Sequence, residues 1–181
     1  DIGVSRGLGD VYKRQDLDSL APQAAAPHSP ANAAAITDHD SPQFTVAYIG
    51  ACTGAKLDDL RAAAGMLKGR TVASGTRLLV APASRADQAQ AADEGVMAIL
   101  ESAGATILAT ACGMCAGYGP NRLAADDVCI SSTARNFRGR MGAPGSRVWL
   151  ASPASVAAAA VTGRLTDPRE MDPHENPRNT I

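Results

Sequence analysis

The chain has 181 residues and a formal net charge of −1, so it offers no strongly basic surface for nucleic acid or an anionic membrane. Hydrophobic residues make up 45% of it and aromatic residues only 3%, so small aliphatic side chains must build the core. Its apolar runs fall short of the roughly 20 residues that cross a bilayer. Its four cysteines have no regular spacing, which does not fit a disulfide framework. We expect one domain in the cytoplasm, with no nucleic-acid or membrane partner.

The two ends of the chain are expected to carry no function. Residues 1–15 show neither helical nor strand periodicity, which indicates a non-native or disordered segment. Residues 167–181 are polar and contain three prolines, which indicates a loose tail.

Residues 16–43 are rich in alanine and proline and are expected to form an extended connector. Prolines here exclude a regular helix or a central strand, and they stand at Pro22, Pro27 and Pro30. His28 and His39 also lie in this stretch. Histidines in a proline-rich connector are usually exposed or hydrogen-bonded locally, so neither is assigned to a metal.

Residues 44–166 predict a domain in which strands and helices alternate. Short apolar runs rich in β-branched residues predict strands at 44–49, 77–81, 105–108, 128–131 and 148–151. Helical periodicity, capping residues and terminal glycines predict helices at 57–68, 84–103 and 153–162. Strands that alternate with helices in this way form a parallel sheet with right-handed crossovers, so the expected fold class is α/β.

Two of these helices show a buried face in the sequence. In the first, apolar residues recur at helical spacing at Leu57, Leu60, Ala64 and Leu67. In the second, which Ser84 is expected to cap, the inward residues are Ala89, Ala92, Val96, Ile99 and Leu100.

Cysteines follow two of the predicted strands. Cys52 comes just after the strand at 44–49, and Cys112 and Cys115 form a Cys-x-x-Cys loop after the strand at 105–108. The carboxyl ends of parallel strands meet at one edge of the sheet, where open α/β folds bind ligands. If the two strands are neighbours, the three thiols can meet there. Thiolates are the preferred ligands of iron–sulfur clusters, so the pattern predicts a metal or cluster site.

Other uses of the cysteines remain open at this point. A Cys-x-x-Cys pair can be a redox dithiol, although such a pair normally opens a helix and Gly119-Pro120 follows soon after Cys115. A structural zinc site would need four protein ligands, and Cys129 would have to be the fourth. Cys129 lies inside an apolar strand and is better interpreted as a small buried residue.

Three arginines lie in a predicted loop after the strand at 128–131, at positions Arg135, Arg138 and Arg140. The planar guanidinium group binds carboxylates through paired hydrogen bonds. A basic loop beside a metal cluster would suit a substrate with more than one carboxylate. A solvated basic loop is the common alternative.

Five motifs follow one another along the chain with a characteristic spacing. They are 48–54 (YIGACTG), 56–64 (KLDDLRAAA), 112–115 (CGMC), 135–140 (RNFRGR) and 151–154 (ASPA). Together they resemble the aconitase superfamily and, within it, the large subunits of 3-isopropylmalate dehydratases. The connector at 20–30 is similar to that family's connection into its third domain, and the resemblance covers residues 16–169.

The resemblance implies a three-layer parallel-sheet domain of the aconitase type, with cluster loops at the carboxyl ends of the strands. It implies Cys52, Cys112 and Cys115 as ligands of a [4Fe–4S] cluster with one open iron, and Arg135 and Arg140 as residues that bind substrate carboxylates. The family reaction is the reversible dehydration of a hydroxy-di- or tricarboxylate. The resemblance therefore implies a hydro-lyase. The nearest match is 3-isopropylmalate dehydratase of leucine biosynthesis, and the alternatives are dimethylmalate, homoaconitate or aconitate hydratase.

Two positions depart from the family's pattern, and several of its parts have no counterpart in this chain. Many members have asparagine where this chain has Gly54 and Ala134, which suits a divergent dehydratase branch. Family members have further domains before this one, so we expect the chain to be a fragment without catalytic acid–base residues. The base is expected on a small swivelling subunit or domain. The chain alone is expected not to turn over substrate.

Overall fold

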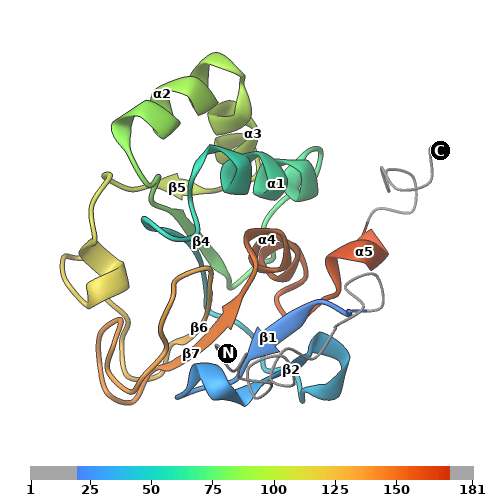
Figure 1. Ribbon diagram of the computed structural model, residues 1–181, viewed down its shortest axis with the longest axis vertical. Helices are drawn as coiled ribbons and strands as arrows, with labels where there is room; N and C mark the ends of the chain where they lie inside the picture. Colours follow the sequence, from blue (N-terminus) through green and yellow to red (C-terminus); the bar gives the residue numbers. More distant parts are fainter. Residues whose placement is uncertain (1–19, 172–181) are drawn as a thin grey trace, which may run out of the picture.

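The computed structural model describes residues 20–171, which form a mixed β-sheet with helices packed on one face (Figure 1). The sheet has seven strands in the order β2-β1-β7-β6-β3-β4-β5. Their bounds are β1 Gln23–Ala25, β2 Ala33–Ala35, β3 Val46–Ile49, β4 Arg77–Val80, β5 Thr106–Ile107, β6 Val128–Ser131 and β7 Arg147–Ala151. The predictions for residues 1–15 and for the last part of the tail lie outside the described residues.

Five strands, β3 to β7, form the parallel part of the sheet, as the sequence predicted. β3 lies between β6 and β4, and its Val46 is paired with Cys129 on one side and Arg77 on the other. β5 pairs with β4, and β7 pairs with β6. The α/β fold class is confirmed. Both β3 and β5 lead into cysteine-bearing loops at the carboxyl edge of this sheet.

The proline-rich connector adds two short antiparallel strands that the sequence did not predict. β1 pairs with β7, where Ala24 lies opposite Ala151, and β2 pairs with the other side of β1. The prediction that prolines exclude an inner strand is therefore wrong. β1 is only three residues long and contains no proline, so no ladder hydrogen bond is lost. The 3₁₀ turns η1 (Pro30–Asn32) and η2 (Ile36–Asp38) flank β2, and His39 Nε2 lies 2.8 Å from the Ala24 carbonyl oxygen.

Helices cover one face of the sheet, which is called the first face below (Figure 1). Their bounds are α1 Leu57–Leu67, α2 Arg85–Asp93, α3 Val96–Ser102, α4 Pro153–Thr162 and α5 Pro168–Met171. α1 packs against α3 and α4, and it buries Leu60, Ala64 and Leu67 as predicted. α4 begins at the cap Ser152 and ends at Gly163, also as predicted. No helix in the described range 20–171 is long and apolar enough to span a membrane.

The predicted helix at 84–103 is broken into α2 and α3. Gly95 has φ +76°, a left-handed conformation that interrupts the helix and that glycine adopts without strain. Ser84 caps α2 as expected. The break changes which residues face inward, so Ala89 and Ala92 are exposed and Ala91 is buried instead.

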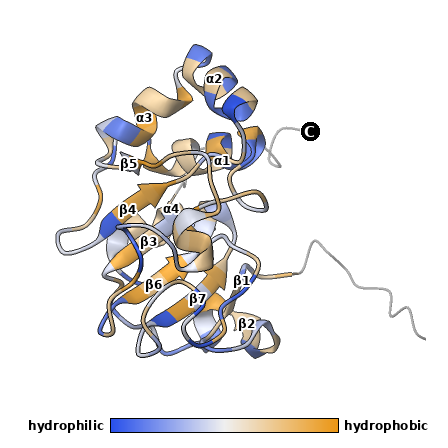
Figure 2. Ribbon diagram, turned by 90° about the vertical axis from the view of Figure 1, so that its left-hand side faces the viewer, coloured by the Kyte–Doolittle hydropathy of each residue, from blue (hydrophilic) through white to orange (hydrophobic). Residues whose placement is uncertain are grey.

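The second face of the sheet is covered, within residues 20–171, by loops and by the 3₁₀ turn η3 (Gly113–Ala116). The strands of the sheet are largely hydrophobic (Figure 2). The apolar surface of this face is formed by alternating strand side chains and by Ala81 just after β4, and the strand residues are Val46, Tyr48, Leu79, Cys129 and Val148. The loops place Met114, Leu123 and Met141 on this surface. The third layer that was expected is thus a layer of loops.

The tail that was expected to be loose begins with an ordered turn. Asp167 is 6% exposed and pairs with Arg169 at 2.6 Å. Arg70 donates a hydrogen bond to the Met171 carbonyl oxygen at 2.6 Å. Helix α5 therefore packs against the domain, which the polar composition did not predict.

Candidate functional site

Cys52 lies in the loop between β3 and α1, at the carboxyl edge of the sheet, and its side chain is exposed. Ser132 closes the base of this loop. Its hydroxyl accepts a hydrogen bond from the Gly50 amide at 3.0 Å and donates one to the Gly54 carbonyl oxygen at 2.8 Å. A Cβ at Gly50 would lie 2.5 Å from Cζ of Tyr48, so only glycine allows the chain to pass so close to the ring.

Cys112 and Cys115 lie at η3, which packs over the second face of the sheet. Cys112 is exposed and Cys115 is half-buried. The strands before the two cysteine loops, β3 and β5, are not neighbours, because β4 lies between them. The condition under which the three thiols were expected to meet is therefore not fulfilled. Met114, which is 3% exposed, packs in the same apolar cluster as Tyr48 of β3. The buried Met114 therefore brings η3 back across β4 toward the Cys52 loop.

The pKa of the Cys115 thiol depends on the two other thiols and on Arg140. Burial raises the pKa of the Cys115 thiol, and the charge and hydrogen bonding of the Arg140 side chain oppose this shift. The thiols of Cys112 and Cys52 raise the same pKa when they are charged. Because the energy between two charges falls with their separation, Cys52, Cys112 and Arg140 lie near enough to Cys115 to affect the pKa of its thiol.

Two buried polar atoms at this site make no hydrogen bond, and they are the Tyr48 hydroxyl and Arg140 Nε. Burial, followed by the charge of Cys115, raises the pKa of the Tyr48 phenol. The Cys115 amide approaches this hydroxyl, but the geometry does not complete a hydrogen bond. Buried polar groups are nearly always hydrogen-bonded. The site therefore has hydrogen-bonding capacity beside a thiol that the described residues do not use.

The predicted arginine loop lies beyond β6. Arg135 is exposed, whereas Arg140 is half-buried and interacts with Cys115. Asn136 is fully buried and donates hydrogen bonds to the carbonyl oxygens of Ala26, at 2.9 Å, and Val148, at 3.2 Å. These bonds tie the loop to the connector and to β7. Asn136 was not predicted as a functional residue from the sequence, although an amide inside a basic loop is a signal that could have indicated it.

Known protein families provide an independent comparison for this fold. The family model for the Aconitase family (aconitate hydratase) matches residues 39–163. The chain belongs to the aconitase family. The resemblance recognised in the five motifs is confirmed, as is the α/β domain that it implied.

Curated relatives of this aconitase-family chain carry more specific names. It is 46% identical over 162 residues to the 3-isopropylmalate dehydratase large subunit 2 of Archaeoglobus fulgidus, covering 90% of this chain and 38% of the relative. It is 45% identical over 156 residues to the 3-isopropylmalate dehydratase large subunit of Herpetosiphon aurantiacus, covering 86% and 37%. It is 44% identical over 160 residues to the homoaconitase large subunit of Thermus thermophilus, covering 88% and 38%. The chain thus spans no more than 38% of the length of these relatives.

Residues 20–171 contain no group of three or more His, Cys, Asp or Glu side chains placed to hold one metal ion. The chemistry of the three thiols fits an iron–sulfur cluster, because such clusters take cysteine thiolates as their ligands. The unpaired Tyr48 hydroxyl and Arg140 Nε also suit an anionic, sulfur-rich group.

The remaining cysteine has the role that the sequence indicated. Cys129 is 0% exposed and lies in the apolar cluster on the second face of the sheet. Burial raises the pKa of its thiol, as expected for a small core residue. The metal-ligand role of Cys52, Cys112 and Cys115 stays a prediction.

Proposed function

We propose that the chain is the cluster-binding part of a [4Fe–4S]-dependent hydro-lyase that acts on a hydroxy-dicarboxylate. In its most specific form, the proposal is a 3-isopropylmalate dehydratase large subunit of leucine biosynthesis. One observation carries it, namely that Arg140 Nε is buried without a partner while its side chain interacts with the Cys115 thiol. The names of the Archaeoglobus and Herpetosiphon relatives support the choice of substrate.

The side chains divide into two roles in this proposal. Cys52, Cys112 and Cys115 hold the cluster from two loops at the carboxyl edge of the sheet. Three protein thiolates leave one iron open, and such an iron supplies a Lewis acid for hydroxyl and carboxylate oxygens. The exposed Arg135 and the half-buried Arg140 bind substrate carboxylates. Because the Arg140 side chain also interacts electrostatically with the Cys115 thiol, it orients the substrate relative to the cluster ligands.

The chain needs partners that complete this chemistry. The relatives are named large subunits, which supports a small subunit or swivelling domain as the partner that brings the catalytic base. We propose no catalytic acid–base residue in this chain and no turnover by the chain alone. Reduced thiols are required for cluster binding, so the cytoplasm is the proposed compartment. The net charge of −1 supports neither a nucleic-acid partner nor a membrane partner.

Homoaconitate is the best supported alternative substrate, because the Thermus relative is named a homoaconitase large subunit. Dimethylmalate and aconitate are further alternatives. Titration of the cluster-loaded chain with 3-isopropylmalate, homocitrate, dimethylmalate and citrate separates them. We expect 3-isopropylmalate to perturb the iron spectrum at the lowest concentration, and a stronger response to homocitrate would favour the homoaconitase assignment.

Two functions of a different class compete with the proposal. A zinc-stabilised α/β binding module would bind about one zinc, with no iron absorption after anaerobic reconstitution. A thiol oxidoreductase would need only Cys112 and Cys115, so its activity would survive Cys52→Ser.

Iron and sulfide analysis after anaerobic reconstitution tests the proposal. The chain is expected to hold about four irons and four sulfides. Cys52→Ser, Cys112→Ser and Cys115→Ser should each lose most of this content. Cys129→Ala, which removes a buried thiol far from solvent, is the matched control and should keep it. A chain without iron, or a full cluster in the Cys52→Ser variant, would overturn the proposal.

A further inference from the structure

We propose that Ser132 is a positioning residue that fixes Cys52 for binding, an inference that rests on the cluster proposed above. Ser132 follows β6 and is 8% exposed. Its backbone amide donates to the Tyr48 carbonyl oxygen at 3.1 Å, so the residue is itself held against β3. A rigid anchor therefore stands beside the loop that presents the exposed Cys52 thiol.

The hydroxyl of Ser132 joins the two sides of the Cys52 loop. It accepts from the Gly50 amide at 3.0 Å, and it donates to Gly54 O at 2.8 Å, with Gly50 O at 3.3 Å as the other acceptor. Gly50 and Gly54 lie two residues before and two residues after Cys52. One buried hydroxyl thus closes a five-residue loop. Ser132 lies 82 positions after Gly50 and 78 positions after Gly54 in the chain.

The loop and the hydroxyl fit one another in size. A Cβ at Gly54 would lie 2.1 Å from the backbone oxygen of Ser132 and 2.6 Å from its hydroxyl oxygen. A side chain at position 54 would therefore push the loop away from its anchor. Because the nearest atom belongs to the backbone, trimming Ser132 would not relieve this clash. The absence of a side chain at Gly54 is what allows the loop to be held.

The neighbouring Ser131 provides a matched control. It is also buried, at 0% exposure, and its hydroxyl donates to Thr133 Oγ1 at 2.9 Å and accepts from the Thr133 amide at 3.1 Å. Ser131→Ala and Ser132→Ala each remove a buried hydroxyl at the same strand end. Only the second removes the link to the Cys52 loop.

The test compares both variants of the 181-residue chain by two measurements. Hydrogen exchange at residues 50–54 of the cluster-free protein reports the loop itself, and iron release to a chelator reports the cluster. For Ser132→Ala, we expect exchange in this segment and iron release each to become roughly tenfold faster, as for other lost supports of metal ligands. Ser131→Ala should change neither, although both variants lose a similar amount of thermal stability.

Each outcome decides between the alternatives. Equal exchange at 50–54 in the two variants, or equal iron release from them, overturns the positioning role. If the parent chain binds no iron, the proposed function fails, while the exchange measurement still decides whether Ser132 holds the loop. If Ser132→Ala does not fold, Ser132→Cys carries the test by exchange in the cluster-free protein, because a thiol keeps a side chain of similar size but hydrogen-bonds Gly50 and Gly54 only weakly. A Ser132→Cys protein with the exchange rate of the parent then overturns the inference.

Discussion

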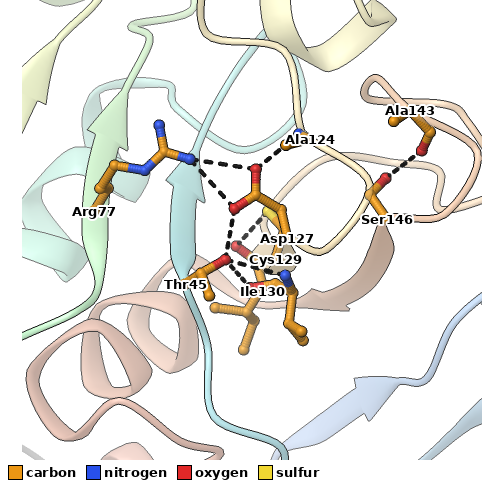
Figure 3. Close-up of polar contacts among 9 residues, drawn as sticks. Thr45, Arg77, Ala124, Asp127, Cys129, Ile130, Ala143 and Ser146 are labelled. Atoms are coloured by element: carbon orange, nitrogen blue, oxygen red, sulfur yellow. Dashed lines mark hydrogen bonds and ion pairs between the residues drawn. The ribbon is translucent and has the colours of Figure 1, made fainter.

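The two ends of the parallel strands differ in how their buried polar groups are satisfied. At the amino ends, the Asp127 carboxylate accepts hydrogen bonds from Thr45 Oγ1 and the Ala124 amide, each at 2.8 Å, and pairs with Arg77 at 3.3 Å (Figure 3). At the carboxyl ends, the Tyr48 hydroxyl and Arg140 Nε are buried without partners. The buried Asp127 carboxylate at the amino ends thus has its hydrogen-bonding partners within the chain. The two buried atoms at the carboxyl ends can still hydrogen-bond a ligand.

This difference separates stability from function along the same strands. Asp127 precedes β6, Thr45 precedes β3 and Arg77 begins β4, so one carboxylate joins the starts of three strands. At the other edge, the groups that would serve a cluster lie on loops that follow the strands, where open α/β sheets place their sites. Substitutions at the two ends should therefore have different consequences.

The largest effect on stability is expected for Asp127→Ala at the amino end. The variant removes the buried carboxylate that accepts hydrogen bonds from the half-buried Thr45 hydroxyl and from the Ala124 amide. We expect the free energy of unfolding in urea to fall by about 2–3 kcal/mol.

The exposed neighbour Asp126 is the control for this change. Asp126→Ala should alter the free energy of unfolding by no more than about 0.5 kcal/mol. Equal losses in the two variants would show that the Asp127 network does not hold the strand starts together.

Asn136→Ala should give the next largest effect, and it acts on the arginine loop at the carboxyl end. The variant removes the hydrogen bonds that Asn136 donates to the carbonyl oxygens of Ala26 and Val148, which costs about 1–2 kcal/mol of stability. Tryptic cleavage after Arg135 should become faster because the loop is released. Cleavage after the exposed Arg164 serves as the internal reference and should not change. Unchanged cleavage after Arg135 would show that Asn136 does not anchor the loop.

A matched pair of hydroxyl deletions compares the two ends directly. Thr45→Val removes a hydroxyl that bonds Asp127 and accepts from the Val128 amide at 3.1 Å, and it should cost about 1 kcal/mol in urea unfolding. Tyr48→Phe removes a hydroxyl with no partner, and the cluster-free protein should lose no stability. A loss for Tyr48→Phe as large as that for Thr45→Val would contradict the difference between the ends.

The smallest effect concerns a carboxylate outside both ends, Asp167, which pairs with the exposed Arg169. Hydrogen bonding from Arg169 holds the pKa of Asp167 below its usual range. A lowered pKa in the folded state stabilises the protein above the usual aspartate pKa of about 3.9, and this contribution is lost as the pH falls through the folded value. Between about pH 6 and pH 3, the free energy of unfolding in urea should therefore fall slightly more for the parent than for Asp167→Asn. Identical pH profiles would show that the pair contributes nothing.

The sequence predicted what local patterns can encode. The spacing of Leu60, Ala64 and Leu67 identified α1 with its buried face. A glycine at position 95 could have indicated the break. The helical periodicity on both sides of it predicted one continuous helix instead. The strands of the connector were not visible, because β1 and β2 consist of Gln23 and alanines, whose pairing depends on β7.

The candidate site was predictable only in its chemistry. Cys52, Cys112 and Cys115 could be found because cysteine is rare in the chain, and the arginines because they cluster. Their supports could not be found, since Ser132 reaches its partners across 82 positions and Asn136 reaches Ala26 across 110. Such contacts exist only once the sheet has formed.

Electron paramagnetic resonance of the reconstituted chain after mild oxidation tests the central claim most directly, namely that three cysteines of one edge hold a cluster with an open iron. The iron without a protein ligand should be lost first, leaving a three-iron signal of about one spin per chain while about three irons remain. A chain that binds no iron, or a cluster that keeps all its irons under oxidation, would contradict the claim.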